Sequence, residues 1–320
     1  KLSNHWPLPG IAQQKEFFRE FVQPFVNRDE RVFVIISDAL RFEIAQELCD
    51  RLNHERKGIA DILAIQGVVP SFTALGMAAL LPYKSLTYDS GLNISIDGQS
   101  TSGIAQREKI LQAKVRDAIA ISFSDVKGMK RDQLRKTIQG KKVIYIYHNT
   151  IDARGDHAAT EHEVFQAAEE AIMELSQLIN HLVNNVSATY IYITADHGFI
   201  YKRSRLQEAD KTARLTEIGD LEKRRFIISD QFVERSDTLT ISLDYIFGEN
   251  SGKYVVTPRG TMRYRRQGEG ANYIHGGAML QEIVVPVIKY KNDRSDSQQN
   301  EVRKVQVKLT SISRKITSMI

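Results

Sequence analysis

The 320-residue chain has few of the residues that build disulfide-linked or membrane-spanning proteins. It contains one cysteine, Cys49, so an intramolecular disulfide framework is excluded and a reducing compartment is favoured. No apolar run approaches the roughly 20 residues that a transmembrane helix needs, and residues 1–9 lack a signal-peptide core. The composition therefore predicts a soluble, cytoplasmic, globular protein without a membrane partner.

The chain also has only a small excess of positive charge, because it contains 44 Lys and Arg residues and 39 Asp and Glu residues. The formal charge of +5 permits an anionic ligand but does not by itself indicate nucleic acid. We expect a helical lead-in at residues 1–30, a main domain at 31–290, and at 291–320 a polar linker with the start of a truncated domain. Since the chain starts without Met and stops in a strand-like stretch, we expect a fragment of a longer polypeptide.

Three strand-like segments are each followed by an acidic side chain. The segments are residues 31–37, 142–147 and 190–194, and the acids that follow them are Asp38, Asp152 and Asp196. Their β-branched and aromatic residues are typical of buried parallel strands. His197 and Gly198 come directly after Asp196, and open α/β sheets bind ligands at the carboxyl ends of strands. Carboxylate and imidazole groups suit Zn²⁺ or Mn²⁺, although a strand-end Asp can also cap a turn or a helix.

Other candidate ligands follow the strand at residues 142–147. Asp152 and Asp156 are four residues apart and His157 comes next, so Asp152 and either later residue could share one ion. His148 lies in the same segment. His275 precedes two glycines and is a further candidate ligand.

Thr73 lies at the start of a predicted helix. Residues 74–81 are mostly apolar, Pro70 precedes them, and Pro82 ends the run. A helix N-terminus favours an anion, and a hydroxyl held there beside a cation can act as a nucleophile. The alternative is that Ser71 or Thr73 only caps the helix.

Basic residues are concentrated in residues 202–270, where short apolar runs predict an antiparallel insertion over the carboxyl edge of the sheet. The candidate nucleic-acid contacts in this insertion are Arg224, Arg225, Arg263, Arg265 and Arg266. A basic cap beside metal ligands would suit a phosphate backbone, and a solvated surface is the alternative. The secondary structure of residues 84–142 is the hardest to predict from the sequence. Arg107, in this part of the chain, is typical of a solvated helix residue.

Four segments in order carry a family resemblance. They are Ile-Ser-Asp-Ala-Leu-Arg at 36–41, Pro-Ser-Phe-Thr-Ala-Leu-Gly-Met-Ala-Ala-Leu-Leu-Pro at 70–82, Tyr-His-Asn-Thr-Ile-Asp-Ala-Arg-Gly-Asp at 147–156, and Thr-Ala-Asp-His-Gly-Phe-Ile-Tyr at 194–201. Together the segments resemble the PglZ family of the alkaline phosphatase-like superfamily, found in bacteriophage exclusion and phage growth limitation systems. The resemblance implies an α/β fold with a central, mostly parallel sheet between helical layers and a smaller antiparallel or irregular insertion.

The resemblance also implies two divalent metal sites, with Zn or Mn as the ion. One site maps onto Asp38, Thr73, Asp196 and His197, and the other onto Asp152, Asp156 and His275, with His157 and His148 as alternative ligands. Many relatives have His at the position of Asp156, which is where this sequence departs from the pattern. Arg41 and Arg107 are candidates for phosphate binding.

The expected function is a metal-dependent phosphodiesterase or nuclease in anti-phage defence, with Thr73 as the nucleophile. DNA is the expected substrate, and other defence proteins, such as a methyltransferase, are the expected partners. Two alternatives are a non-catalytic scaffold subunit and a phosphodiesterase for small nucleotides. A cofactor-independent phosphomutase is disfavoured, because residues 84–142 are short for its second domain.

Overall fold

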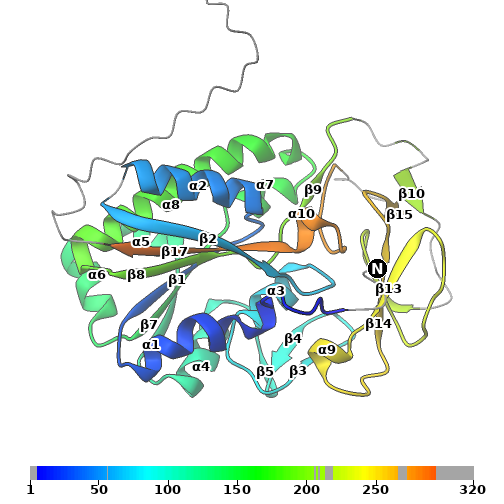
Figure 1. Cartoon of the computed structure of the whole chain (residues 1–320), viewed down its shortest axis with the longest axis horizontal. Coiled ribbons are helices and arrows are strands. Elements are labelled where there is room, and N and C mark those ends of the chain that lie inside the picture. Colours follow the sequence, from blue (N-terminus) through cyan, green and yellow to red (C-terminus); the bar gives the residue numbers. More distant parts are fainter. Residues whose placement is uncertain are drawn as a thin grey trace, which may run out of the picture.

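A six-stranded sheet forms the centre of the molecule (Figure 1). The computed structural model describes residues 6–55, 57–204, 207, 210–212, 219–265 and 272–292. In sheet order the strands are β2 (Gly58–Gln66), β17 (Val284–Asn292), β8 (Tyr190–Thr194), β1 (Val32–Ser37), β7 (Val143–His148) and β6 (Ala118–Ser122). β1, β6, β7 and β8 run parallel, and β17 runs antiparallel to both β2 and β8. The expected α/β fold with a mostly parallel sheet is confirmed.

The register of the three middle parallel strands brings their carboxyl ends level. Ser37 at the end of β1 pairs with His148 of β7, and Ile36 pairs with Thr194 of β8. All six residues of β1 are buried, as expected of an uncharged strand between two helical layers. The polar segments that follow β7, β1 and β8 therefore meet at one edge of the sheet.

Helices cover both faces of the sheet (Figure 1). One face carries α2 (Phe42–Glu55), α7 (Ile151–Gly155) and α8 (Val164–Val186), and the other carries α1 (Gln23–Asn27), α3 (Thr73–Ala79) and α4 (Ile104–Lys114). In α8 the buried side chains of Leu175, Leu178, Ile179 and Leu182 recur at helical spacing, which fixes the face turned to the core. Two short helices, α5 (Phe123–Gly128) and α6 (Arg131–Ile138), precede β7.

The N-terminal segment is part of the same core. It contains a 3-10 turn at Gln14–Glu16 and a π-helix at Phe18–Val22, followed by α1. The ring of Phe25 lies 4.9 Å from that of Tyr190, and the ring of Phe21 lies 5.8 Å from that of Tyr192, between ring centroids. This aromatic cluster attaches the lead-in to β8.

The segment between β8 and β17 forms the insertion at the carboxyl edge of the sheet (Figure 1). A four-stranded antiparallel sheet has the order β11 (Gly219–Glu222), β12 (Ile227–Ser229), β14 (Tyr254–Pro258) and β13 (Thr238–Ser242). Two small pairs accompany it: β9 (Ile200–Tyr201) with β16 (Tyr273–Ile274), antiparallel, and β10 (Lys211–Thr212) with β15 (Arg263–Tyr264), parallel. The helices of this region are α9 (Asp244–Phe247) and α10 (Leu280–Ile283).

A second small antiparallel sheet lies between α3 and α4. Its strands are β3 (Leu86–Tyr88), β4 (Ile94–Ile96) and β5 (Gln99–Ser100). A 3-10 turn at Glu161–Glu163 leads into α8. In the part of the chain that the structure describes, no helix combines the length and the apolar character that crossing a bilayer requires.

Candidate metal centre

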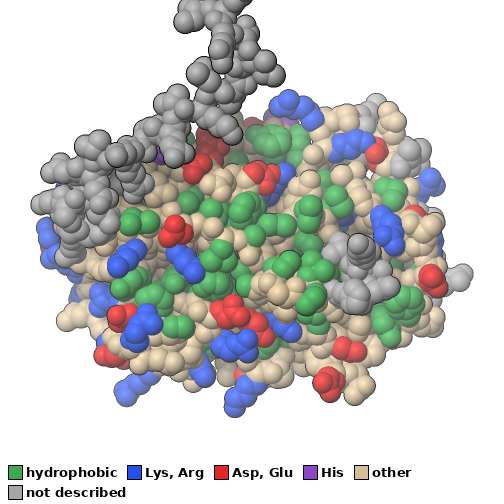
Figure 2. Space-filling model, in the orientation of Figure 1, with side chains coloured by type: hydrophobic (Ala, Val, Ile, Leu, Met, Phe, Trp, Pro, Cys, Tyr) green, Lys and Arg blue, Asp and Glu red, His purple; other side chains and the backbone are tan. Residues whose placement is uncertain are grey.

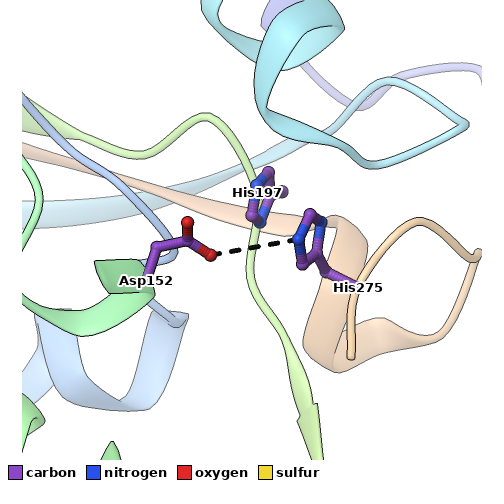
Figure 3. A group of neighbouring side chains, drawn as sticks. All are labelled: Asp152, His197 and His275. Atoms are coloured by element: carbon purple, nitrogen blue, oxygen red, sulfur yellow. Dashed lines mark ion pairs between the residues drawn. The ribbon is translucent and has the colours of Figure 1, made fainter. Parts of the chain in front are cut away.

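Two groups of side chains at the level strand ends could each hold a metal ion. Ligand atoms of Asp38, Asp196 and His197 lie within 4.8 Å of one another, and so do those of Asp152, His197 and His275. Figure 3 shows Asp152 on α7 and His275 on the loop before α10, pointing toward each other beside His197. Asp38, Asp152 and Asp196 were expected to meet at this edge because each follows a parallel strand, and the structure brings them together.

The carboxyl groups of Asp38 and Asp196 are buried and only partly satisfied. Oδ1 of Asp196 accepts hydrogen bonds from the amides of Ala39 (3.1 Å) and His197 (2.9 Å). By contrast, Oδ1 of Asp38 and Oδ2 of Asp196 are buried without a hydrogen-bond partner. Such orphaned carboxylate oxygens are costly unless a cation or a proton neutralises them, so this pair fits a divalent ion.

The pKa shifts in the group follow from the same crowding. Burial, and then the charges of Asp196 and Asp152, raise the pKa of Asp38 well above its usual value. Burial also raises the pKa of Asp196 to about 7. Groups whose charge is this unfavourable without a counterion are typical of functional sites.

Both histidines are oriented by backbone carbonyl groups. Nδ1 of His197 lies 3.0 Å from the carbonyl oxygen of Gly198, and Nδ1 of His275 lies 3.2 Å from that of Ser71. Because a carbonyl only accepts, Nδ1 carries the proton and Nε2 is left unprotonated, as a metal ligand requires. The two rings stack with centroids 4.0 Å apart, and burial lowers the pKa of each imidazole, which favours the neutral form.

Thr73 faces this group from the first turn of α3. Its Oγ1 lies 3.1 Å from Nε2 of His197. No side chain caps α3, whose N-cap residue is Phe72. The Ser71 hydroxyl instead donates to the carbonyl of Gly277 at 2.7 Å and accepts from the amide of Gly276 at 3.2 Å. Neither hydroxyl has the capping role that the sequence left open.

Two glycines allow the close contacts that assemble the centre. A Cβ on Gly76 of α3 would lie 2.3 Å from the carbonyl oxygen of Asp196. A Cβ on Gly198 would lie 2.0 Å from the carbonyl oxygen of Gln281. A larger residue at Gly76 would push α3 away from the loop that carries Asp196 and His197, and one at Gly198 would push that loop away from α10.

Three other expected ligands are placed differently. Asp156 and His157 are exposed, and neither belongs to a described ligand group. His148 is buried, with Nδ1 2.9 Å from Oγ of Ser37 and Nε2 3.1 Å from Oε2 of Glu174. Because both ring nitrogens already have protein partners, His148 does not serve as the alternative ligand that the sequence suggested.

The two candidate phosphate-binding arginines border the centre. Arg41 is ion-paired with Glu43, and its guanidinium carbon lies 5.0 Å from the ring centroid of Phe199. Arg107 stacks over Tyr147 at 4.9 Å and donates from Nε to the carbonyl of Thr101 at 3.0 Å. Its charge opposes the upward shift of the Asp38 pKa, so Arg107 is not the solvated helix residue that its sequence context predicted.

The basic residues of the insertion do not form one surface. Arg225 is fully buried and pairs with the buried Glu282 at 2.7 Å, and Arg263 is also buried. This burial contradicts the expectation that both contact nucleic acid at the surface. Arg224 is half-buried and Arg265 is exposed, whereas Arg266 lies outside the described residues.

Two contributors to the centre were missed from the sequence. The hydroxyl of Tyr273 donates to Oδ1 of Asp152 at 2.9 Å. Nε2 of the buried Gln14 donates to the carbonyl oxygens of Ala195 (3.0 Å) and Asp196 (2.7 Å). Tyr273 could have been suspected from its place two residues before His275, but no sequence signal marks Gln14.

Comparisons with known proteins agree with this architecture. The family model for the BREX system PglZ alkaline phosphatase-like domain matches residues 17–290. The chain is 57% identical over 316 residues to the alkaline phosphatase-like protein PglZ of Bacillus cereus (strain H3081.97), covering 99% of this chain and 37% of that protein. It is 41% identical over 292 residues to the alkaline phosphatase-like protein BrxZ of Escherichia coli O9:H4 (strain HS), covering 89% of this chain and 33% of that protein. The chain thus spans about a third of the length of these relatives.

Solved structures show the same fold at low identity. Murine ectonucleotide pyrophosphatase/phosphodiesterase 5 (ENPP5, NPP5) matches with a TM-score of 0.53 and 11% identity, covering 82% of this chain and 88% of that chain. An inactive variant of that murine protein, in complex with AMP, matches with a TM-score of 0.50 and 10% identity at the same coverage. The likeness to these solved structures shows the fold alone. The matches to the family model and to the two relatives are matches of sequence. On that basis, the chain belongs to the PglZ alkaline phosphatase-like domain family of BREX systems.

Proposed function

We propose that this domain is a metal-dependent phosphodiesterase in which Thr73 is the nucleophile. The observation that carries the proposal is the position of the Thr73 hydroxyl, 3.1 Å from Nε2 of His197 and beside two buried carboxyl groups with orphaned oxygens. A hydroxyl without a capping partner, facing a group of metal-ligand type, is placed for nucleophilic attack. Asp38, Thr73, Asp196 and His197 would hold one ion, of zinc or manganese type.

The second ion would be held by Asp152 and His275, with Asp156 as a further ligand if it turns inward. A divalent ion in these sites supplies charge that favours the ionised hydroxyl and the negative phosphoryl oxygens. The chain's own residues hold the Thr73 hydroxyl beside His197, fix both imidazole tautomers, and place Arg41 and Arg107 at the border of the centre. Thr73 Oγ1 would lose its proton and form the new bond to phosphorus while the bond to the leaving oxygen breaks and that oxygen takes up a proton. Water would then attack the same phosphorus and break its bond to Thr73 Oγ1, which regains a proton.

We further propose that the substrate is a nucleic-acid phosphodiester, DNA above all, cleaved in phage defence together with other BREX proteins. The family description places the domain in a BREX system. The insertion lies over the carboxyl edge of the sheet, where a strand of nucleic acid would approach, and Arg265 is exposed and Arg224 half-buried there. These two arginines replace the larger basic set that the sequence suggested.

The test compares Thr73→Ala and Thr73→Ser with the parent protein. Thr73→Ala should abolish hydrolysis of a chromogenic phosphodiester and of DNA while leaving the melting temperature within a few degrees, because Thr73 makes no helix cap. Thr73→Ser should keep part of the activity. Chelation should stop the parent enzyme, and added Zn²⁺ or Mn²⁺ should restore it.

Three results would overturn parts of this proposal. Full activity of Thr73→Ala would show that Thr73 is not the nucleophile. Absence of bound metal and of activity under every added ion would favour a non-catalytic scaffold. Faster cleavage of short dinucleotides than of long DNA would make the substrate a small nucleotide.

A further inference from the structure

A dense excess of positive charge lies in a segment outside the insertion. Residues 127–142 contain seven Lys and Arg residues and one acid, Asp132. This formal excess of six is larger than the excess of five for the whole chain. The remaining residues are therefore close to neutral in total, and this short segment is a local concentration of positive charge that a polyanion would sense.

The segment begins in α5 at the carboxyl end of the sheet, where Lys127 pairs with Glu174, and α6 carries it toward the opposite end. The end of α6 and the turn into β7 lie there, beside the residues that precede β1 and β8. Figure 1 places α6 at the left of the molecule and the insertion at the right. Figure 2 shows Lys and Arg side chains along the same left margin. We call this surface the basic end face and define it by Arg31, Lys130, Arg131, Arg135, Lys136 and Lys142.

Two adjoining hollows cross the basic end face. One has a volume of about 460 Å³, and its charged lining residues are Arg31, Arg135, Lys136 and Asp132. The other has a volume of about 420 Å³ and is lined by Arg31 and Lys142 together with the acids Asp29 and Glu30. Arg31 belongs to both hollows, so the two form one groove with Arg31 at its middle.

Hydrogen bonds to backbone carbonyl groups hold the arginines of this groove in place, and these bonds leave the guanidinium charges uncompensated. Nε of Arg31 donates to the carbonyl of Lys141 at 2.9 Å, and Nε of Arg135 donates to the carbonyl of Asn185 at 2.7 Å. Within the described ranges, no acidic side chain forms an ion pair with either guanidinium. Their terminal nitrogens thus remain available for an anion, and a guanidinium binds phosphate through two parallel hydrogen bonds.

A purely structural role accounts for only part of this arrangement. Arg135 satisfies a carbonyl in the last turn of α8, where basic residues are favoured. Lys127 and Lys142 are compensated by ion pairs with Glu174 and Asp29. In contrast, Lys130, Arg131 and Lys136 are exposed and have no ion pair in the described part of the chain, so helix capping does not explain them.

We propose that the basic end face binds the sugar-phosphate backbone of nucleic acid, independently of the metal centre. Arg131, Arg135 and Lys136 lie within about 8 Å along one helix, a spacing that suits a ligand with a charge every few ångströms. No aromatic side chain occurs in residues 124–142, and the two aromatic residues that line the second hollow are Phe33, which is buried, and Tyr190, which packs on Phe25, so we expect the face to contact phosphates and not to stack on bases. Nucleic acid would thus be held at one end of the domain while the metal centre at the other end remains open.

The experiment measures binding without cleavage, in Thr73→Ala protein with a chelator present. A fluorescent 30-base-pair duplex is titrated at several salt concentrations against the parent and against Arg31→Ala/Arg135→Ala/Lys136→Ala. We expect at least a tenfold loss of affinity at low salt. We also expect the slope of log K against log salt to fall by roughly 0.9 for each lost phosphate contact, or about 2 to 3 in total.

A second variant guards against misfolding, and a third controls for net charge. Lys130→Ala/Arg131→Ala/Lys136→Ala removes side chains that make no described hydrogen bond, so its melting temperature should equal that of the parent while its slope falls. Arg51→Ala/Lys84→Ala/Lys109→Ala removes the same charge elsewhere and should leave the slope unchanged.

Several outcomes would overturn the proposal. Equal slopes for the parent and both end-face variants would show that the face does not touch the duplex. An equal loss of affinity and of slope in the charge-matched control would show that the net charge of the protein, and not this face, determines binding. Competition by inorganic phosphate as strong as by duplex would indicate a small-anion site, and stronger competition by polyglutamate would indicate an acidic protein. None of these outcomes bears on catalysis, because the protein tested lacks Thr73.

Discussion

Tyr273 shows at the scale of one residue how the candidate metal centre is built. Its hydroxyl donates to Oδ1 of Asp152 at 2.9 Å, the same carboxylate oxygen that lies 3.9 Å from Nε2 of His275. Its ring packs on Phe199, with centroids 4.8 Å apart, and fills the space beside Gly155. Residues that hydrogen-bond a metal ligand orient it, and their loss costs affinity even though they never touch the ion.

We therefore predict that Tyr273→Phe weakens zinc binding at the Asp152 and His275 site by about 10-fold to 100-fold. The ring packing stays, so the metal-free protein should lose only about 1 kcal/mol, the value of one hydrogen bond. Calorimetric titration with Zn²⁺ measures the affinity, and thermal melting measures the stability. Tyr190→Phe is the matched control, because Tyr190 lies at the amino end of β8. Equal affinities for both variants would contradict an orienting role for Tyr273.

The same scale shows what single residues reveal in a sequence. Asp38, Asp196 and His197 could be predicted, because an uncharged strand followed abruptly by a ligand side chain is a local signal. Gln14 could not be predicted, because its role depends on a loop that lies more than 180 residues away. Arg225 was misread because an arginine in a basic run looks exposed, and only the fold reveals its partner Glu282.

At the scale of elements, a buried ion pair fastens the insertion to α10. Glu282 accepts from Nε of Arg225 at 3.1 Å and from Nη2 at 2.7 Å, and also from the amides of Gly277 (2.8 Å) and Met279 (3.0 Å). A Cβ on Gly277 would lie 2.4 Å from Nη2 of Arg225, so the loop after His275 wraps closely around the guanidinium. The ion pair therefore links three parts of the chain: the segment just before β12, which carries Arg225, the loop after His275, and α10.

We predict that Glu282→Gln lowers the free energy of unfolding by about 3–5 kcal/mol, because it leaves the Arg225 charge buried without a counter-charge. The matched control is Asp237→Asn, which removes the partner of Arg235 in a pair that is about one-third exposed. That change should cost less than about 1 kcal/mol, since solvent screens the pair. Urea unfolding at constant pH measures both values. Similar costs for the two variants would mean that the insertion is not fastened by Arg225 and Glu282.

Elements could be predicted from the sequence to different degrees. The long buried strands were legible, but nothing in the composition of β17 tells that it runs antiparallel between β2 and β8. Strands β3, β4 and β5 have two or three residues each, too few to show a period, which explains why residues 84–142 were hard to read. The expected helical lead-in at residues 1–30 is divided into a 3-10 turn, a π-helix and α1, and it changes from π to α next to Pro24, which has no N–H for the preceding turn.

At the scale of the whole molecule, the ligand groups connect distant parts of one chain. Asp38, Asp152 and Asp196 follow three neighbouring strands, and His275 comes from the far side of the insertion. Without a cation, the carboxyl groups repel one another and bury orphaned oxygens, so the centre opposes folding. With an ion bound as proposed, the same groups would hold the sheet and the insertion together. Metal binding and the stability of the fold should therefore be coupled. Replacing a carboxylate should raise the stability of the metal-free protein and lower the stability of the metal-bound protein.

The last prediction concerns Asp196→Asn, compared with the parent by thermal melting in chelator and in Zn²⁺ or Mn²⁺. In chelator the variant should melt higher, because the amide keeps the bonds from Ala39 and His197 and removes one buried charge. In excess metal the parent should melt higher, gaining about 2.7 kcal/mol at an ion concentration of 100 times Kd, whereas the variant gains little. Asp156→Asn is the comparison variant: Asp156 is exposed, lies outside both ligand groups and is proposed only for the second ion, so this variant should keep the part of the metal response that comes from the first site. Loss of that response in Asp156→Asn but not in Asp196→Asn would move the stabilising ion away from the strand ends and toward the exposed end of α7.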